Sequence, residues 1–180
     1  MTELDVETLR RCRRVDPAAL GMLYDCYRRP VYYLARRMVG EAEAEDVCQE
    51  TFIAVFRAVA KFEGKSKLST WVLAVATRVC LMHLRKRRRL DTAAEPADAS
   101  EAEPMTLLSP SHELLNKEFL KRLADAMDRL PENQRMAVSL RSFEEMSYEE
   151  IARAMNCRLE QVRATLFRAR CRLLKFMEGY

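Results

Sequence analysis

Residues 130–177 constrain the fold most strongly, because short-range signals there mark three helices and the turns between them. Pro131 suits the start of a helix, which we expect over residues 132–143. Ser147 and Glu150 have the spacing of a capping box, in which each side chain satisfies a backbone N–H at a helix start. A further helix is therefore predicted to begin directly after Ser147.

The two helices that follow, predicted over residues 148–155 and 159–177, form a helix-turn-helix, with the turn at Asn156. In the second helix, apolar residues at spacings of three or four form a buried stripe: Val162, Leu166, Ala169 and Leu173. The opposite face carries Glu160, Arg163, Ala164, Phe167, Arg168 and Cys171. Arginine suits guanine edges and phosphates, and an apolar side chain suits the thymine methyl. This face predicts a helix that enters the major groove, and the alternative is an ordinary packing unit with a solvated basic face.

The charge of the chain is divided into blocks. Residues 1–90 hold 18 Lys or Arg against 11 Asp or Glu, and residues 116–180 hold 13 against 10. Residues 91–115 hold six acids and no Lys or Arg. Two basic blocks around an acidic connector favour two contacts with a polyanion over a membrane surface.

Cysteine and histidine give no sign of a metal site. The six cysteines form no C-x-x-C pair, and the two histidines have no ligand spacing. Most of the cysteines fall on apolar helix faces, so we expect reduced core cysteines in a reducing cytoplasm. We find no signal peptide, and no apolar run approaches the roughly 20 residues of a membrane span.

Helix signals also run through the first 90 residues. Asp16 suits an N-cap, and Pro30 is expected to break or kink the helix that follows. Gly40 suits a C-cap, Gly64 permits a positive backbone angle, and Ser69 can cap the next helix. We expect helices over residues 4–14, 17–29, 31–38, 42–61, 70–88 and 113–130.

Two surfaces in the first 90 residues are candidates for binding a partner. Asp46, Gln49, Glu50 and Ile53 form a stripe separate from the apolar side of their helix, and a solvated acidic face is the alternative. The predicted helix over residues 70–88 has a face that ends in a run of basic residues. That face comprises Thr70, Ala74, Thr77, Arg78, Leu81 and Arg85. The basic run suits phosphate contact, and a favourable interaction with the helix dipole is the alternative.

Two sets of motifs resemble conserved regions of bacterial sigma factors of the extracytoplasmic-function group, within the sigma-70 family. Residues 44–52, Phe62, the Ser-Thr-Trp of residues 69–71 and the closing arginine run are similar to the second conserved region. Residues 130–135, 147–152 and 162–170 are similar to the fourth. Both sets occur in the family's order and together cover most of residues 16–176.

The resemblance implies an RNA polymerase sigma factor, which directs core polymerase to specific promoters and initiates transcription in a stress or envelope response. The expected fold is all-α, with two small helical domains and a flexible acidic linker. Residues 1–90 would bind core polymerase and melt the promoter, residues 91–112 would form the linker, and residues 113–180 would form the helix-turn-helix domain.

The resemblance also implies roles for individual residues. The core-polymerase surface would comprise Asp46, Gln49, Glu50 and Ile53. The surface for the minus-ten element, taken as a single strand, would comprise Phe62, Gly64, Lys65, Ser66, Lys67, Arg78 and Arg85. The surface for the minus-thirty-five element would comprise Arg158, Glu160, Arg163, Ala164, Phe167 and Arg168. The chain departs from the family pattern at Arg158, Ala164 and Thr165, which affects the base code more than the docking.

The expected partners are bacterial core RNA polymerase, promoter DNA as duplex and as non-template single strand, and a separate anti-sigma protein. We expect a cytoplasmic protein with no catalytic residue, cofactor or metal. The main alternative is a helix-turn-helix regulator that binds duplex DNA without polymerase. A helical enzyme or metal protein is a weaker alternative, because the sequence shows no nucleophile–base pair, phosphate loop or metal-ligand spacing.

Overall fold

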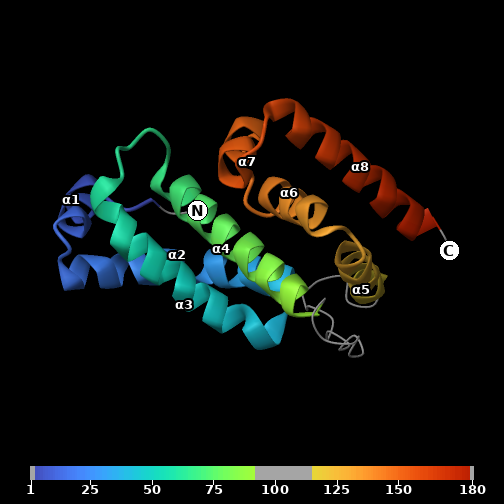
Figure 1. Ribbon diagram of the computed structural model, residues 1–180, viewed down its shortest axis with the longest axis horizontal. Helices are drawn as coiled ribbons and strands as arrows, with labels where there is room; N and C mark the ends of the chain where they lie inside the picture. The colour runs from blue at the N-terminus through green and yellow to red at the C-terminus, as the bar shows by residue number, and fades with distance from the viewer. Residues whose placement is uncertain (1–2, 92–114, 179–180) are drawn as a thin grey trace.

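The computed structural model describes residues 3–91 and 115–178, and every regular element in these two ranges is a helix (Figure 1). In chain order they are α1 (Val6–Arg13), α2 (Pro17–Val39), α3 (Glu41–Ala58), the 3-10 turn η1 (Val59–Lys61), α4 (Leu68–Asp91), α5 (Leu115–Asp128), α6 (Glu132–Ser142), α7 (Tyr148–Met155) and α8 (Leu159–Glu178). The predicted all-α class is confirmed. From position 92 onward, the predicted linker lies outside the described residues.

Helices α1 to α4 form the N-terminal group, in which α2, α3 and α4 pack against one another. Their apolar stripes supply fully buried side chains, including Leu23, Tyr27, Leu34, Met38, Val47, Val55 and Leu84. The Asp16 carboxylate accepts the Ala19 N–H at 3.0 Å, which confirms the predicted N-cap of α2. Gly40 ends α2 with a φ of 88°, and its N–H donates to the Arg36 carbonyl. A side chain with a Cβ would be strained in that conformation.

Pro30 does not break α2, contrary to the alternative of two separate helices. The helix runs continuously from residue 17 to residue 39 with Pro30 inside it. Proline removes one backbone hydrogen bond and crowds the carbonyl four residues earlier. Tyr27, Val31 and Leu34 are buried on either side of Pro30, so packing against α3 and α4 keeps the helix continuous.

Helices α5 to α8 form the C-terminal group, and α7 and α8 are the predicted helix-turn-helix. The capping box is present: the Ser147 N–H donates to the Glu150 carboxylate at 2.8 Å, and the Glu150 N–H donates to the Ser147 hydroxyl at 3.2 Å. Asn156 ends α7 in the left-handed conformation, with a φ of 51°. Ile151 and Val162 are buried in the same apolar cluster, and α7 packs against α8.

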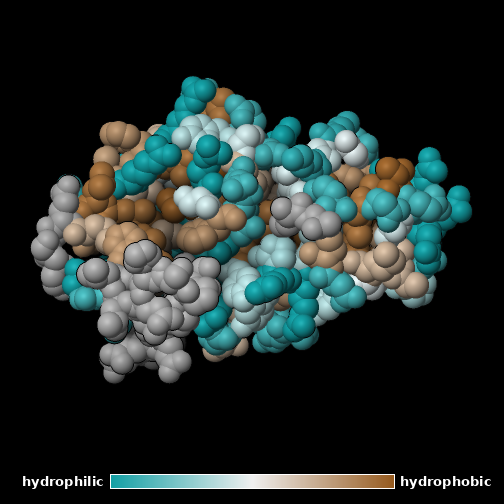
Figure 2. Space-filling model, turned by 180° about the vertical axis from the view of Figure 1, so that it is seen from behind, coloured by the Kyte–Doolittle hydropathy of each residue, from teal (hydrophilic) through white to brown (hydrophobic). Residues whose placement is uncertain are grey.

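The two groups are packed together. Figure 1 shows α4 beside the helix-turn-helix, and α4 contacts α7 while α2 contacts α6. Buried side chains of both groups belong to one continuous apolar cluster. Figure 2 shows more apolar surface over the α5–α8 end of the molecule, where Phe119 and Leu174 are exposed. The contact between the groups is therefore part of the core, while the outer end of the C-terminal group is less completely covered.

Candidate nucleic-acid interface

The acidic stripe of α3 lies on the surface, as its spacing predicts. Asp46, Gln49, Glu50 and Ile53 are all exposed, and Ile53 retains 49% of its accessible surface. Residues three and four apart share one face of a helix. The opposite side of α3 is buried against α2 and α4. The stripe is thus a rigid patch of carboxylate, amide and aliphatic groups that faces solvent.

The loop between η1 and α4 presents its central residues to solvent and buries its two ends. Gly64 has a φ of 75°, as predicted, and Lys65 and Lys67 are exposed. Phe62 is only 7% exposed, and its ring lies 5.2 Å from the Trp71 ring between centroids. Leu68 is buried as well. The two apolar ends therefore attach the loop to the core and leave the lysines and the half-buried Ser66 accessible.

The predicted basic face of α4 is only partly exposed. Arg78 and Arg85 are on the surface, whereas Thr77 and Leu81 are buried. The Thr77 hydroxyl donates to the Leu73 carbonyl of its own helix at 2.8 Å. The Thr70 hydroxyl donates to the Glu150 carboxylate of α7 at 2.9 Å. This part of α4 therefore serves the contact between the groups, and the surface available to a nucleic acid consists of the loop lysines and the two arginines.

All six residues predicted for the minus-thirty-five surface are exposed in the helix-turn-helix. They are Arg158, Glu160, Arg163, Ala164, Phe167 and Arg168. Phe167 retains 68% of its accessible surface, and the buried side of α8 comprises Val162, Leu166 and Ala169. The Arg158 N–H donates to the Gln161 side chain at 2.8 Å, so Gln161 completes the start of α8 and the Arg158 side chain stays on the surface. The face can offer guanidinium donors and an aromatic ring to a groove.

The contact between the two groups was not predictable from the sequence. Arg37 of α2 and Glu144 of the α6–α7 loop form an ion pair at 2.5 Å, and both side chains are less than 10% exposed. The Arg37 guanidinium also lies 4.3 Å from the centroid of the Phe143 ring. Burial raises the pKa of the Glu144 carboxyl above its usual value and lowers the pKa of Arg37. Loss of solvation thus outweighs the attraction between the two charges.

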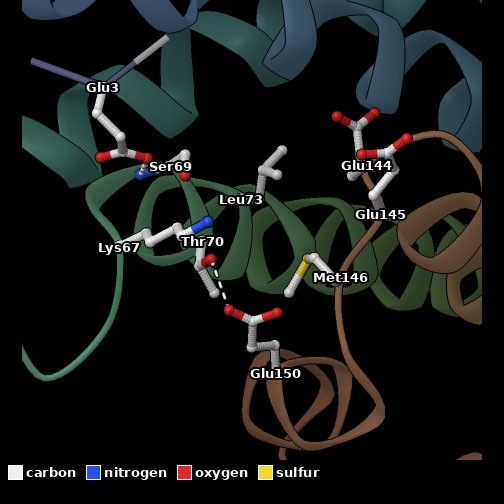
Figure 3. A pocket seen from close by; sticks show the side chains of 9 residues that line it. All are labelled: Glu3, Lys67, Ser69, Thr70, Leu73, Glu144, Glu145, Met146 and Glu150. Carbon is white, nitrogen blue, oxygen red and sulfur yellow. Dashed lines mark hydrogen bonds between the residues drawn. The ribbon is translucent and has the colours of Figure 1, made fainter. Parts of the chain in front are cut away.

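Three weaker polar contacts accompany this ion pair. Arg135 donates to the Met38 carbonyl at 3.1 Å, Arg88 pairs with Glu132 at 3.0 Å, and Thr70 bonds to Glu150. Figure 3 shows the hollow between the groups, where Thr70 points to Glu150 and further carboxylates line the wall. The ion pair joins residues 107 positions apart, so no local spacing could have indicated it.

Three of the six cysteines are core residues, and the other three are partly buried. Cys12, Cys48 and Cys80 are buried, and burial raises the pKa of Cys48 to about 11 and that of Cys80 to about 12. Among the residues that the structure describes, no group of three or more His, Cys, Asp or Glu side chains could hold a metal ion. Within residues 3–91 and 115–178, no helix has the length and apolar character that crossing a membrane requires.

Comparison with known proteins matches both helical groups to one family. Residues 23–90 match the family model for sigma-70 region 2, and residues 120–173 match the model for sigma-70 region 4. The chain is 36% identical over 175 residues to the RNA polymerase sigma-H factor of Pseudomonas aeruginosa, covering 93% of this chain and 91% of that protein. It is 32% identical over 173 residues to the ECF RNA polymerase sigma-E factor of Escherichia coli, covering 92% and 90%.

Solved structures share the fold. The sigma factor RpoE from Bartonella quintana, crystallised with the anti-sigma factor NepR, has a TM-score of 0.70 at 21% identity, covering 88% of this chain and 96% of that one. CnrH, in complex with the cytosolic domain of CnrY, has a TM-score of 0.67 at 18% identity and covers 96% of both chains. The two matched regions and the sigma-H and sigma-E relatives establish that the chain belongs to the extracytoplasmic-function group of the sigma-70 family of sigma factors.

Proposed function

We propose that the chain binds bacterial core RNA polymerase, directs it to specific promoters and takes part in opening them. The observation that carries the proposal is the exposed face of α8, where Arg163, Phe167 and Arg168 lie on the second helix of a helix-turn-helix. Family membership supports the polymerase partner, because the relatives are named as RNA polymerase sigma factors. The protein would act in the cytoplasm by binding, without a catalytic residue of its own.

The test mixes purified protein with bacterial core polymerase and runs the mixture on a sizing column. Co-elution, followed by initiation on a supercoiled promoter template, is the expected result. Separate elution, combined with tight and specific binding to duplex DNA, would favour the helix-turn-helix regulator that works without polymerase. The chain contains matches to sigma-70 regions 2 and 4 in that order, and this favours the sigma factor over the regulator.

We infer that residues 1–90 form the core-binding and promoter-melting domain and that residues 113–180 form the upstream-reading domain. The exposed stripe Asp46, Gln49, Glu50 and Ile53 would dock on a basic coiled coil of the large polymerase subunit. Carboxylates and an amide provide acceptors for basic side chains, and Ile53 adds apolar area.

The α8 face is expected to read the minus-thirty-five element through the major groove. Arg163→Ala or Arg168→Ala should each cost about 1–3 kcal/mol and relax preference at one base, because a base contact is lost. Lys175→Ala removes a charge on the same helix, about 18 Å beyond Arg163 and about 10 Å beyond Arg168, and serves as the control. The measurement is transcription from promoters changed at one upstream base at a time. Unaltered promoter choice in both arginine variants would contradict this assignment.

The loop around Gly64 is expected to handle the minus-ten element as a single strand. Lys65, Lys67, Arg78 and Arg85 would hold phosphates, and Ser66 and the backbone at Gly64 would meet an unstacked base. Phe62 would attach this loop to the core, because its ring is buried.

Replacing residues 63–67 by glycine and serine should leave holoenzyme and closed promoter binding intact. Opening should fall by roughly tenfold, because the phosphate and base contacts disappear. A template already melted across the minus-ten element should recover much of the activity, and this serves as the control. Permanganate footprints as strong as those of the unaltered protein on duplex promoter would rule out this role for the loop.

We also propose that a separate anti-sigma protein controls this chain. Structures of two proteins with the same fold were solved as complexes, one with an anti-sigma factor and one with a cytosolic domain of a second protein. The test is purification of the chain from uninduced cells. A stoichiometric protein partner other than polymerase is the expected result, and purification without any such partner would contradict the proposal.

A further inference from the structure

Glu3 caps the helix that follows the proposed minus-ten loop. Its carboxylate accepts the Leu68 N–H at 3.1 Å and the Ser69 N–H at 3.3 Å. These are the first two residues of α4, whose N–H groups have no partner inside the helix. The prediction that Ser69 caps this helix is therefore wrong: Ser69 is the second helical residue, and the cap comes from 65 positions earlier. Figure 3 shows the Glu3 carboxylate directed at the Ser69 backbone.

The other end of the same loop is contacted by Arg13. The Arg13 guanidinium lies 5.9 Å from the centroid of the Phe62 ring. Its Nη2 atom would lie 3.9 Å from a Cβ added at Gly64, so it borders the point where the loop turns with positive φ. Arg13 is the last residue of α1, and α1 packs against η1 directly before the loop. The N-terminal segment thus contacts the loop at its start and at its end.

The segment that supplies both contacts is itself held firmly. The Asp5 carboxylate accepts the Thr8 N–H at 2.9 Å and caps α1. Cys12 is fully buried against α2, and Arg11 pairs with Asp16 at the start of α2 at 3.2 Å. Residues 5–16 therefore form a fixed support from which Glu3 and Arg13 reach the loop.

We propose that Glu3 and Arg13 are positioning residues, which hold the loop of residues 62–67 in the shape that captures the unstacked non-template strand. This inference rests on the proposed function. Both residues precede the part of the chain that matches sigma-70 region 2, which begins at residue 23. The Glu3 carboxylate neutralises the partial positive charge at the start of α4 and fixes the exit of the loop. Arg13 fixes its entry by covering the Phe62 ring.

The negative charge of Glu3 distinguishes a positioning role from direct contact with DNA. A carboxylate repels phosphate, so Glu3 would not bind the strand itself, and its contribution lies in the order that it imposes on the loop. If a smaller fraction of the molecules has the loop in its binding-competent shape, the apparent affinity for the single strand falls in proportion to that fraction. Affinity for core polymerase and for the upstream element should stay unchanged, because those surfaces lie on α3 and α8.

The experiment uses full-length chain without an N-terminal tag, assembled with core polymerase. Holoenzyme affinity is measured for a promoter fork with a single-stranded non-template minus-ten segment, and for a duplex carrying only the upstream element. Glu3→Ala should bind the fork roughly fivefold more weakly, the size of one lost helix cap, with unchanged duplex affinity. Glu3→Gln should recover part of the loss, because its amide oxygen still accepts an N–H. Arg13→Ala should weaken fork binding in the same way.

Two control variants match these changes. Glu7→Ala and Arg14→Ala remove one exposed charge each from the same segment, and both should match the unaltered protein. Equal fork affinity in Glu3→Ala and the unaltered protein would overturn the inference, as would tighter binding. A parallel loss of fork affinity, duplex affinity and thermal midpoint would overturn it too, since it would show a purely structural role. If the unaltered holoenzyme binds the fork no more tightly than the duplex that carries only the upstream element, the proposed function is refuted before any variant is compared.

Discussion

Holoenzyme assembly is expected to weaken by about a hundredfold or more when Glu50 on α3 is replaced by arginine, because like charges across an interface cost several kcal/mol. Asp46→Arg should have the same effect. Both side chains are exposed on one face of a helix whose other side is buried, so the substitutions change a docking surface and leave the core intact. The stripe also contains Ile53, which is half exposed and adds an apolar side chain at the C-terminal end of the face.

The measurement is affinity for core polymerase, read by co-elution and by fluorescence titration. Helix content and thermal midpoint should be preserved, since neither side chain contributes to packing. Glu7→Arg on α1 provides a control with the same change in charge at an exposed position outside the stripe. Undiminished core affinity in both α3 variants would show that the stripe is only solvated surface.

Replacing Arg37 by methionine is expected to separate the two helical groups. Removing one partner of a buried ion pair costs about 3–5 kcal/mol, because the other charge remains buried without compensation. Here the remaining charge would be Glu144, which is almost fully covered and whose pKa is already raised by burial. Small-angle scattering should report a larger radius of gyration, and amide exchange should increase on the facing sides of α4 and α7.

The opened variant should close again as the pH falls. Burial raises the pKa of Glu144, and Arg37 opposes that rise, so loss of Arg37 should raise the pKa further. A carboxyl whose pKa is higher in the docked state stabilises docking when the pH is below its pKa in the undocked state. This stabilisation is lost as the pH rises through its pKa in the docked state. Scattering of Arg37→Met should therefore show an extended chain at pH 8 and a more compact one near pH 5.

Two further variants make the test specific. Arg37→Met combined with Glu144→Met should dock about as well as the unaltered protein, because an apolar pair avoids the cost of burying two charges. Arg28→Met, which removes an exposed ion pair with Glu45 inside the N-terminal group, should have little effect. Arg37→Met scattering that matches the compact unaltered protein at every pH would show that apolar packing alone holds the groups together.

Features that depend on residues a few positions apart could be predicted from the sequence. The capping box of Ser147 and Glu150, the turn at Asn156 and the apolar stripe of α8 were predictable, because each follows from contacts within one or two helical turns. The same applies to the exposed stripe of α3 and to the recognition face, including the unusual exposure of Phe167. A period of 3.6 residues assigns each side chain to a face without knowledge of the rest of the fold.

The partner that meets each of those faces depends on how the helices pack in three dimensions. Pro30 stays inside a continuous α2 because packing on both sides outweighs one lost hydrogen bond. The cap of α4 comes from Glu3 and not from Ser69, and half of the predicted basic face of α4 is buried. Arg37 meets Glu144 across 107 positions of chain. Such contacts arise where separate helices converge, and local spacing carries no information about distant segments that end up adjacent.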